Sequence, residues 1–382
     1  MKFSEVLGQE YLKNHLVKST DNGRVSHAQL FVGKEGSGVL PMAIAYAQYI
    51  LCSTSNDKEA CALKCLKLMH PDLHFAFPVA SNESIKSKPV SNLFLEDWRK
   101  FIELNPYGNL FEWFQSIGIE NKQGQIGVDE AEEIVKALRL KSYEGGYKVM
   151  IIWMAENMNT ECANKLLKLI EEPSAETVFL LLTENQSAIL PTIKSRCQKI
   201  NIPPIKASEI AESLIINGLA DNESAYNIAN MSGGSYFSAL DILNSDSSGV
   251  NFELLFVEWV RLAFKVKASK VAVGDLVLWS EKVSKLPKDI QKQFFIFALE
   301  VFRKSMLRNY KSSTYKEEFK DKGFNFEKFS PFIHNNNIIE LYEEVNKAIY
   351  ELNRNGNPKI IITDLSLKLT RLIHQKPSII DE

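Results

Sequence analysis

The fold of this chain is decided by residues 28–40, which read AQLFVGKEGSGVL. A short apolar run ends there in a glycine-rich turn, Gly33–Gly38, and a helical stretch begins near Pro41. A strand, a glycine-rich loop and a helix in this order are typical of a phosphate-binding unit, because the free N–H groups of the helix N-terminus face the loop. The sequence therefore predicts an α/β unit of that kind.

Four further apolar runs lie at residues 74–79, 148–153, 177–183 and 198–202, with helix-like segments between several of them. Continuous apolar strands that alternate with helices predict a mainly parallel sheet covered on both faces. One of the intervening helices has clear ends. Asn159 or Thr160 can accept hydrogen bonds from its first free N–H groups, and Pro173 ends it.

The strands cease after Pro203-Pro204, and the rest of the chain has a helical pattern. Residues 207–244 form a small helical unit with a turn at Gly233-Gly234. Longer helices are expected beyond it, at residues 252–265, 288–310, 337–353 and 359–374, with an exposed loop at 311–322.

Composition excludes several classes of protein. The 382 residues include 45 Lys+Arg and 47 Asp+Glu, so the net charge of -2 gives no overall nucleic-acid signal. No apolar run approaches the ~20 residues of a membrane span. The first ten residues include acids where a signal peptide needs an apolar segment, so we expect a cytoplasmic protein. The odd count of five cysteines favours a reduced compartment and a metal site over a disulfide framework.

Five motifs together carry a resemblance to a known family. They are VLGQE at 6–10, HAQLFVG at 27–33, NKLLKLIEEP at 164–173, PTIKSRCQ at 191–198 and RNGNPK at 354–359. The chain resembles the delta-prime family of clamp-loader subunits of bacterial DNA polymerase III, within the AAA+ family. The resemblance is strong over the first 200 residues and looser beyond them.

The resemblance implies an AAA+ core with a P-loop-type parallel sheet at 1–203, a small helical lid at 204–247 and an all-α C-terminal collar at 248–382. It also implies a place in a ring of five subunits, beside ATPase subunits of gamma/tau type and the delta subunit. Such a ring opens the sliding clamp and sets it on primed DNA.

The phosphate loop lacks the groups that bind a triphosphate. A working loop reads G-x-x-x-x-G-K-[ST], because the lysine neutralises phosphate charge and the hydroxyl holds Mg²⁺. Gly33 and Gly38 have the right separation, with Gly36 between them, but Val39 and Leu40 follow. Lys34 lies inside the loop and not after Gly38, so it does not occupy the position of the lysine that binds phosphate.

The acidic pair expected after the strand at 148–152 is also missing. Its positions hold Trp153 and Met154, and Glu156 lies two residues further on, where its direction is uncertain. The resemblance places a phosphate-sensing polar residue at Thr183 and an arginine where Phe237 stands. These defects disable the same chemistry, so we expect no productive ATP binding and no intrinsic ATP hydrolysis.

Arg196, in the sequence Ser195-Arg196-Cys197, is the candidate working residue. The resemblance implies that it reaches the ATP site of the adjacent subunit as an arginine finger. A guanidinium there stabilises the charge of the transferring phosphoryl group, which is worth about 10³–10⁵ in rate. The alternative is a structural arginine paired with a local carboxylate.

Cys52, Cys61, Cys65 and His70 form a candidate zinc module near residues 52–70. Related subunits carry C-x₈-C-x₂-C-x₂-C beside His-Pro-Asp. Cys52 and Cys61 fit the first spacing, but the next cysteine is displaced to Cys65, and Lys67 occupies the position of the fourth. A structural zinc with His70 as fourth donor and a degenerate loop with free thiols both remain open. Cys162 and Cys197 are expected in the core.

Residues 77–125 are rich in aromatic side chains, which favour a packed insertion over a surface that stacks nucleic-acid bases. They include Trp98, Phe101, Tyr107, Phe111, Trp113 and Phe114. Two rival functions also stay open. An active ATPase of the same family predicts Mg²⁺-dependent nucleotide binding by the isolated chain. A zinc-stabilised DNA-binding module predicts stoichiometric metal and salt-dependent DNA affinity.

Overall fold

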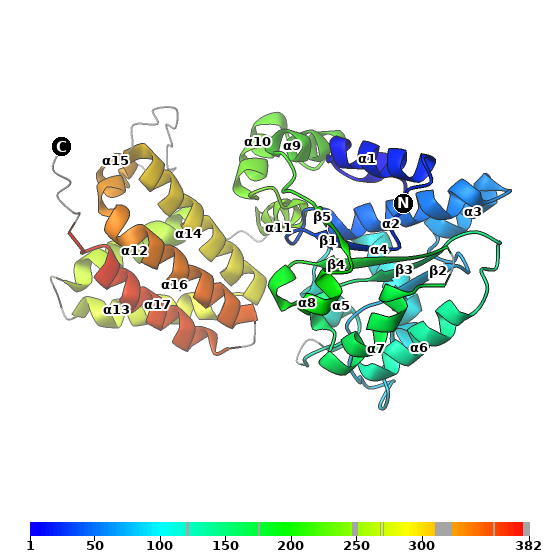
Figure 1. Ribbon diagram of the computed structural model, residues 1–382. Coiled ribbons are helices and arrows are strands. Elements are labelled where there is room, and N and C mark those ends of the chain that lie inside the picture. Colours follow the sequence, from blue (N-terminus) through cyan, green and yellow to red (C-terminus); the bar gives the residue numbers. More distant parts are fainter. Residues whose placement is uncertain are drawn as a thin grey trace. The chain divides into compact units, whose positions relative to one another are not determined.

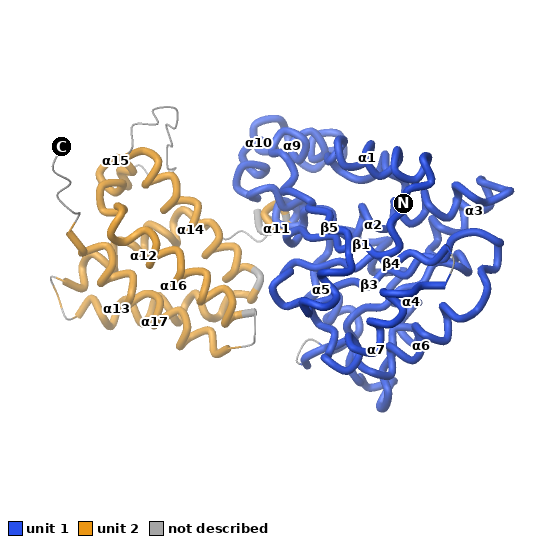
Figure 2. Tube along the Cα trace, viewed as in Figure 1, with its two compact units in different colours: residues 1–240 blue, residues 241–382 orange. Residues whose placement is uncertain are grey.

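The structure is a computed structural model that describes residues 1–119, 122–174, 176–246, 251–267, 269, 271–309, 323–353 and 356–376. The chain divides into two compact units, residues 1–240 and 241–382 (Figure 2). The predicted three-domain boundaries stay a prediction. The loop predicted at 311–322 and the first two residues of the motif at 354–359 lie outside the described residues.

A five-stranded parallel sheet forms the centre of the first unit (Figure 1). Its order is β2-β3-β4-β1-β5, so that the strand preceding the glycine-rich loop lies between β4 and β5. The sheet confirms the predicted fold class. Its strands are β1 (Ala28–Val32), β2 (Leu73–Ala76), β3 (Lys148–Ile152), β4 (Thr177–Thr183) and β5 (Gln198–Asn201).

Helices cover both faces of the sheet, and the alternation of side chains along β3 shows how. Val149 and Ile151 belong to a core that includes residues of α2 (Val39–Thr54) and α3 (Lys58–Leu66). Met150 and Ile152 belong to a second core, with residues of α6 (Val128–Arg139) and α7 (Thr160–Glu171). The remaining N-terminal helix, α1, spans Glu10–Asp21.

Helix α7 begins as predicted. The side-chain oxygen of Asn159 accepts a hydrogen bond from the backbone N–H of Cys162 at 2.8 Å, which satisfies one of the free donors of the first turn. The helix presents Cys162, Leu166 and Ile170 to the core.

The aromatic insertion is packed, as expected. It contains α4 (Leu95–Leu104) and α5 (Leu110–Ser116). Trp98 and Trp113 are fully buried, and the ring of Trp98 stacks on Phe77 at a centroid distance of 4.3 Å. Since buried rings offer no face to a base, these two tryptophans are core residues and do not stack nucleic acid.

Three helices follow the sheet: α9 (Ala207–Ile216), α10 (Asn222–Met231) and α11 (Tyr236–Asp246). The backbone O of Gly234 accepts from the N–H of Ile205 at 2.9 Å, which ties the turn before α11 to the segment that leaves β5. Gly234 has φ +86, a conformation that favours glycine.

The described part of the second unit is helical. Its helices are α12 (Phe252–Val266), α13 (Val271–Ser284), α14 (Lys288–Asn309), α15 (Phe326–Phe329), α16 (Asn335–Asn353) and α17 (Pro358–Leu372). Trp259 is buried at its centre, and its indole N–H donates to the hydroxyl of Ser366 at 2.8 Å. Within the described ranges, every helix is too short or too polar to cross a lipid bilayer.

Candidate functional site

The glycine-rich loop joins β1 to α2 and is held by local hydrogen bonds. The N–H of Gly33 donates to the carbonyl of Thr183 at 3.2 Å, so the loop starts at the carboxyl ends of β1 and β4. The hydroxyl of Ser37 donates to the carbonyl of Lys34 at 2.6 Å. Gly38 then precedes α2 with φ +90, which a residue with a side chain adopts only under strain.

The two positions after Gly38 bring no phosphate-binding group to this loop. Helix α2 begins at Val39, which is half-buried, and Leu40 is buried in the core. Lys34 is exposed. The helix N-terminus therefore keeps its backbone N–H groups but has neither the cation nor the hydroxyl that would hold a triphosphate and its metal.

Tyr107, from the aromatic insertion, lies over the N-terminus of α2. It is 8% exposed, and a side chain built at Gly38 would meet its ring at 3.3 Å. Its hydroxyl accepts a hydrogen bond from the N–H of Leu7 at 2.7 Å, and its ring packs edge-on against Tyr236 at 5.0 Å. Burial raises the pKa of Tyr107 to about 12, so the phenol stays neutral.

The space left beside the loop is small. The cavity lined by the loop, Tyr107, Trp153 and Thr183 has a volume of about 30 Å³. A water molecule takes about that share of liquid volume, whereas ligand pockets hold several hundred Å³. This cavity is much smaller than an ordinary ligand pocket, and Tyr107 forms part of its wall.

The turn before α11 covers the loop from another side. The N–H of Tyr236 donates to the carbonyl of Gly36 at 2.9 Å, and a side chain at Gly36 would collide with the hydroxyl of Ser235 at 2.0 Å. Phe237, where the family resemblance places an arginine, is 5% exposed. An apolar ring is therefore buried at this position, where the resemblance leads one to expect a charged side chain.

The positions of the missing acidic pair are apolar and buried. Trp153 packs against Trp98 at a centroid distance of 5.1 Å and belongs to the core. Met154 is buried with φ +53 and precedes the short 3-10 helix Ala155–Asn157. Neither side chain can hold Mg²⁺ or activate water.

Glu156 supports the loop after β4. Its Oε1 accepts from the N–H groups of Glu184 at 2.9 Å and Asn185 at 3.2 Å. The hydroxyl of Thr183 accepts from the N–H of Asn185 at 3.1 Å, the local hydrogen bond expected for a strand-end residue.

Three carboxyl groups lie close enough to interact beside the loop. Loss of hydration raises the pKa of Glu184 to about 8, and repulsion by Glu35 and Glu156 adds to the shift. Because its pKa is raised, Glu184 holds a proton more readily than an ordinary carboxyl group and adds less negative charge beside the loop.

Arg196 lies on the surface after α8 (Pro191–Lys194) and before β5. Its side chain is 38% exposed, and its Nε lies 2.5 Å from Oε1 of Glu171 at the end of α7. Its Nη1 donates to the carbonyl of Thr192 at 2.9 Å and to the hydroxyl of Ser195 at 3.2 Å. Glu171 therefore provides the local carboxylate that a purely structural arginine would pair with. Contact between Arg196 and a neighbouring subunit stays a prediction.

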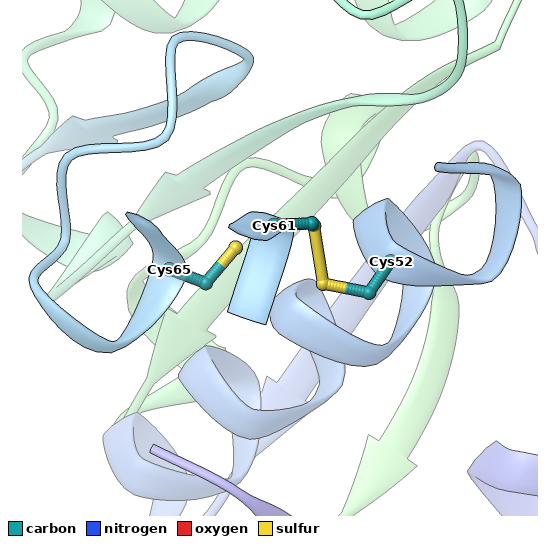
Figure 3. A group of neighbouring side chains, drawn as sticks. All are labelled: Cys52, Cys61 and Cys65. Carbon is teal, nitrogen blue, oxygen red and sulfur yellow. A yellow bond between two sulfur atoms is a disulfide. The ribbon is translucent and has the colours of Figure 1, made fainter. Parts of the chain in front are cut away.

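The cysteine cluster differs from the expectation of reduced thiols. Cys52 and Cys61 form a disulfide, while Cys65 is a free, buried cysteine (Figure 3). The preference for thiols over a disulfide was wrong for this pair, because the end of α2 and the start of α3 bring the two Cα atoms to 5.7 Å, within disulfide range. The spacing of Cys52 and Cys61 in the sequence does not by itself indicate that their Cα atoms lie this close.

The predicted zinc donors nevertheless lie together. The sulfur atoms of Cys52, Cys61 and Cys65 are within 4.8 Å of one another, and Cys61, His70 and Glu144 form a second such group. Nε2 of buried His70 lies 3.3 Å from Oε2 of Glu144. No motif in the sequence singles out Glu144, which reaches the cluster from a distant loop.

The cluster fits zinc only after reduction. A zinc ligand must be a thiolate, and the disulfide removes two. Burial raises the pKa of Cys65 to about 12, so this thiol keeps its proton in the metal-free form. Cys162 is buried in the core as expected, and Cys197 is half-buried.

Together these features define a P-loop-type α/β domain in which apolar residues, Val39 and Leu40, follow the glycine-rich loop. The family model described as "DNA polymerase III, delta subunit" matches residues 8–206, and the chain belongs to this family. The resemblance stated from the motifs is thereby confirmed.

Relatives agree with this assignment. The chain is 30% identical over 205 residues to DNA polymerase III subunit delta' of Bacillus subtilis, covering 52% of this chain and 49% of the relative. It therefore spans about half the length of that relative. It is 25% identical over 403 residues to subunit tau of the same organism, covering 100% of this chain and 63% of the relative. A gamma subunit-related protein structure from Thermotoga maritima aligns with a TM-score of 0.34 at 16% identity, covering 96% of this chain and 99% of that chain.

Proposed function

We propose that this chain is a delta-prime-like clamp-loader subunit that does not hydrolyse ATP itself and supplies Arg196 to the ATP site of a neighbouring subunit. Its proposed partners are ATPase subunits of gamma/tau type and the delta subunit, in a ring of five. In this proposal the ring loads the sliding clamp onto primed DNA in the cytoplasm.

One observation carries the proposal: the chain fills its own nucleotide site with its own side chains, while Arg196 stays at the surface. Tyr107 covers the N-terminus of α2, and Phe237 and Trp153 are buried where charged groups would be needed. The side chain of Arg196, by contrast, is 38% exposed. A defective site beside an intact SRC motif favours a subunit that acts on a neighbour.

The chemistry is electrostatic. A guanidinium stays charged at neutral pH and offers several N–H donors in one plane. Placed beside the γ-phosphate of a neighbour's ATP, it would stabilise the negative charge that spreads over the transferring group. Zinc, if held by the reduced cysteine cluster, would have only a structural part in this account.

The proposal that this chain does not hydrolyse ATP is tested by measuring ATP binding and turnover by the purified chain. We expect no binding at millimolar Mg²⁺-ATP and no turnover by the isolated chain. A reconstituted assembly with gamma/tau-type and delta subunits should hydrolyse ATP when this chain and primed DNA are present, and much less without the chain. Tight Mg²⁺-dependent binding by the chain alone would move it to the active ATPases.

A further inference from the structure

We infer that Glu171 is a positioning residue for Arg196: it holds the guanidinium in one place on the surface of the chain. This inference rests on the proposed function, because it concerns how Arg196 is held before it meets a neighbour's phosphate. Glu171 is the last residue of α7, a helix that packs beside α8.

The guanidinium of Arg196 is held at two of its three nitrogens. Nε lies 2.5 Å from the carboxylate of Glu171, and Nη1 donates to the carbonyl of Thr192 and the hydroxyl of Ser195. Within the described residues, Nη2 makes no hydrogen bond. Contacts from α7 and from the α8 turn thus hold the guanidinium from two elements.

This pair contributes little to stability. The side chains of Arg196 and Glu171 are 38% and 41% exposed, and ion pairs between exposed groups add little to folding stability. Its effect is instead on orientation. A long arginine side chain loses rotamer freedom when it binds, and a side chain already fixed in the binding geometry loses less. Small displacements of such a group can cost about 10²-fold in rate.

The chain offers a matched control. Glu172 follows Glu171 directly and is exposed, and its side chain makes no hydrogen bond or ion pair within the described part of the chain. Replacing Glu172 removes the same charge from the same helix end without removing a contact to Arg196. Any difference between the two variants is therefore due to the contact.

The test uses the full chain in the reconstituted assembly, with the other ATP sites inactivated so that only the site facing Arg196 turns over. Glu171→Ala should lower kcat about 10- to 100-fold with the KM for ATP unchanged, because the neighbour binds the ATP. Glu171→Gln should recover part of the rate, since the amide keeps the shape of the side chain and an oxygen beside the guanidinium. Glu172→Ala should match the wild type.

The double variant separates positioning from a general structural effect. If Glu171 acts only through Arg196, Arg196→Ala with Glu171→Ala has the rate of Arg196→Ala alone. A further loss in the double variant, or a full rate for Glu171→Ala while Arg196→Ala is slow, would overturn the inference and leave the proposed function standing. A full rate for Arg196→Ala would refute both.

Discussion

Glu130 makes the stability of the first unit depend on pH. It lies in the first turn of α6, is 2% exposed, and its Oε2 accepts from the N–H of Ser91 at 2.6 Å. Burial raises the pKa of Glu130 from 4.5 to about 7, although the hydrogen bonds from Ser91 oppose the shift. The replacement Glu130→Gln keeps an oxygen acceptor for Ser91 and removes the charge.

The raised pKa sets the sign and size of the effect. The folded state binds the proton more tightly than the unfolded state, so the stabilisation is complete below about pH 4.5 and is lost as the pH rises through about 7. At about 1.4 kcal/mol per pKa unit, the buried charge costs the folded state about 3 kcal/mol at pH 8. Glu130→Gln should therefore gain about 2 kcal/mol relative to wild type between pH 5 and pH 8.

Urea unfolding of the full chain measures this difference. Hydrogen exchange of peptides from β3 and β4 reports the first unit alone, and wild type and variant are compared at each pH. Glu133→Gln, on the same helix but in an exposed pair with Lys136 at 2.7 Å, is the control and should change stability by less than about 1 kcal/mol at every pH. A difference between Glu130→Gln and wild type that does not vary with pH would refute the reasoning.

Three other predictions follow from the site and the core. Alkylation of the denatured chain, read by mass spectrometry, should modify three cysteines before reduction and all five after it. Five adducts without reductant would contradict the disulfide. Zinc should be retained only by the reduced chain. The double variant Val39→Lys with Leu40→Thr should not bind ATP measurably in equilibrium titrations. The triple variant, which also carries Tyr107→Ala, should bind ATP measurably. Equal ATP affinity of the double and triple variants would show that Tyr107 does not close the site. Trp98→Ala should destabilise the first unit by about 3–5 kcal/mol in urea unfolding, and a loss under 1 kcal/mol would be inconsistent with its full burial.

Much of the fold could be predicted because the deciding signals are local. The apolar runs at 148–153 and 177–183 correspond to β3 and β4, and Asn159 caps α7. The run at 74–79 was predicted too long, since β2 ends at Ala76. Pro78 has no N–H to continue the ladder, and Val79 pairs with Gln125 outside the sheet.

The residue types at the motif positions of the site could also be predicted from the sequence, but the covering of the loop by Tyr107 could not. Val39 and Trp153 occupy motif positions, so their lack of charge is visible in the sequence. The contact of Tyr107 with Gly38 joins segments that are far apart in the chain, and no motif or spacing in the sequence indicates it. The pairing of Glu171 with Arg196 likewise depends on how α7 packs beside α8.

The most direct test of the central claim is ATP turnover at the site that faces Arg196. The assembly is reconstituted with the full chain, primed DNA and clamp, and with the other ATP sites inactivated. Arg196→Ala is compared with wild type and with Lys199→Ala, which removes an exposed cation nearby. The account predicts a loss of about 10³-fold or more for Arg196→Ala alone, with the assembly intact by size-exclusion chromatography. Unchanged turnover in an intact assembly would contradict it.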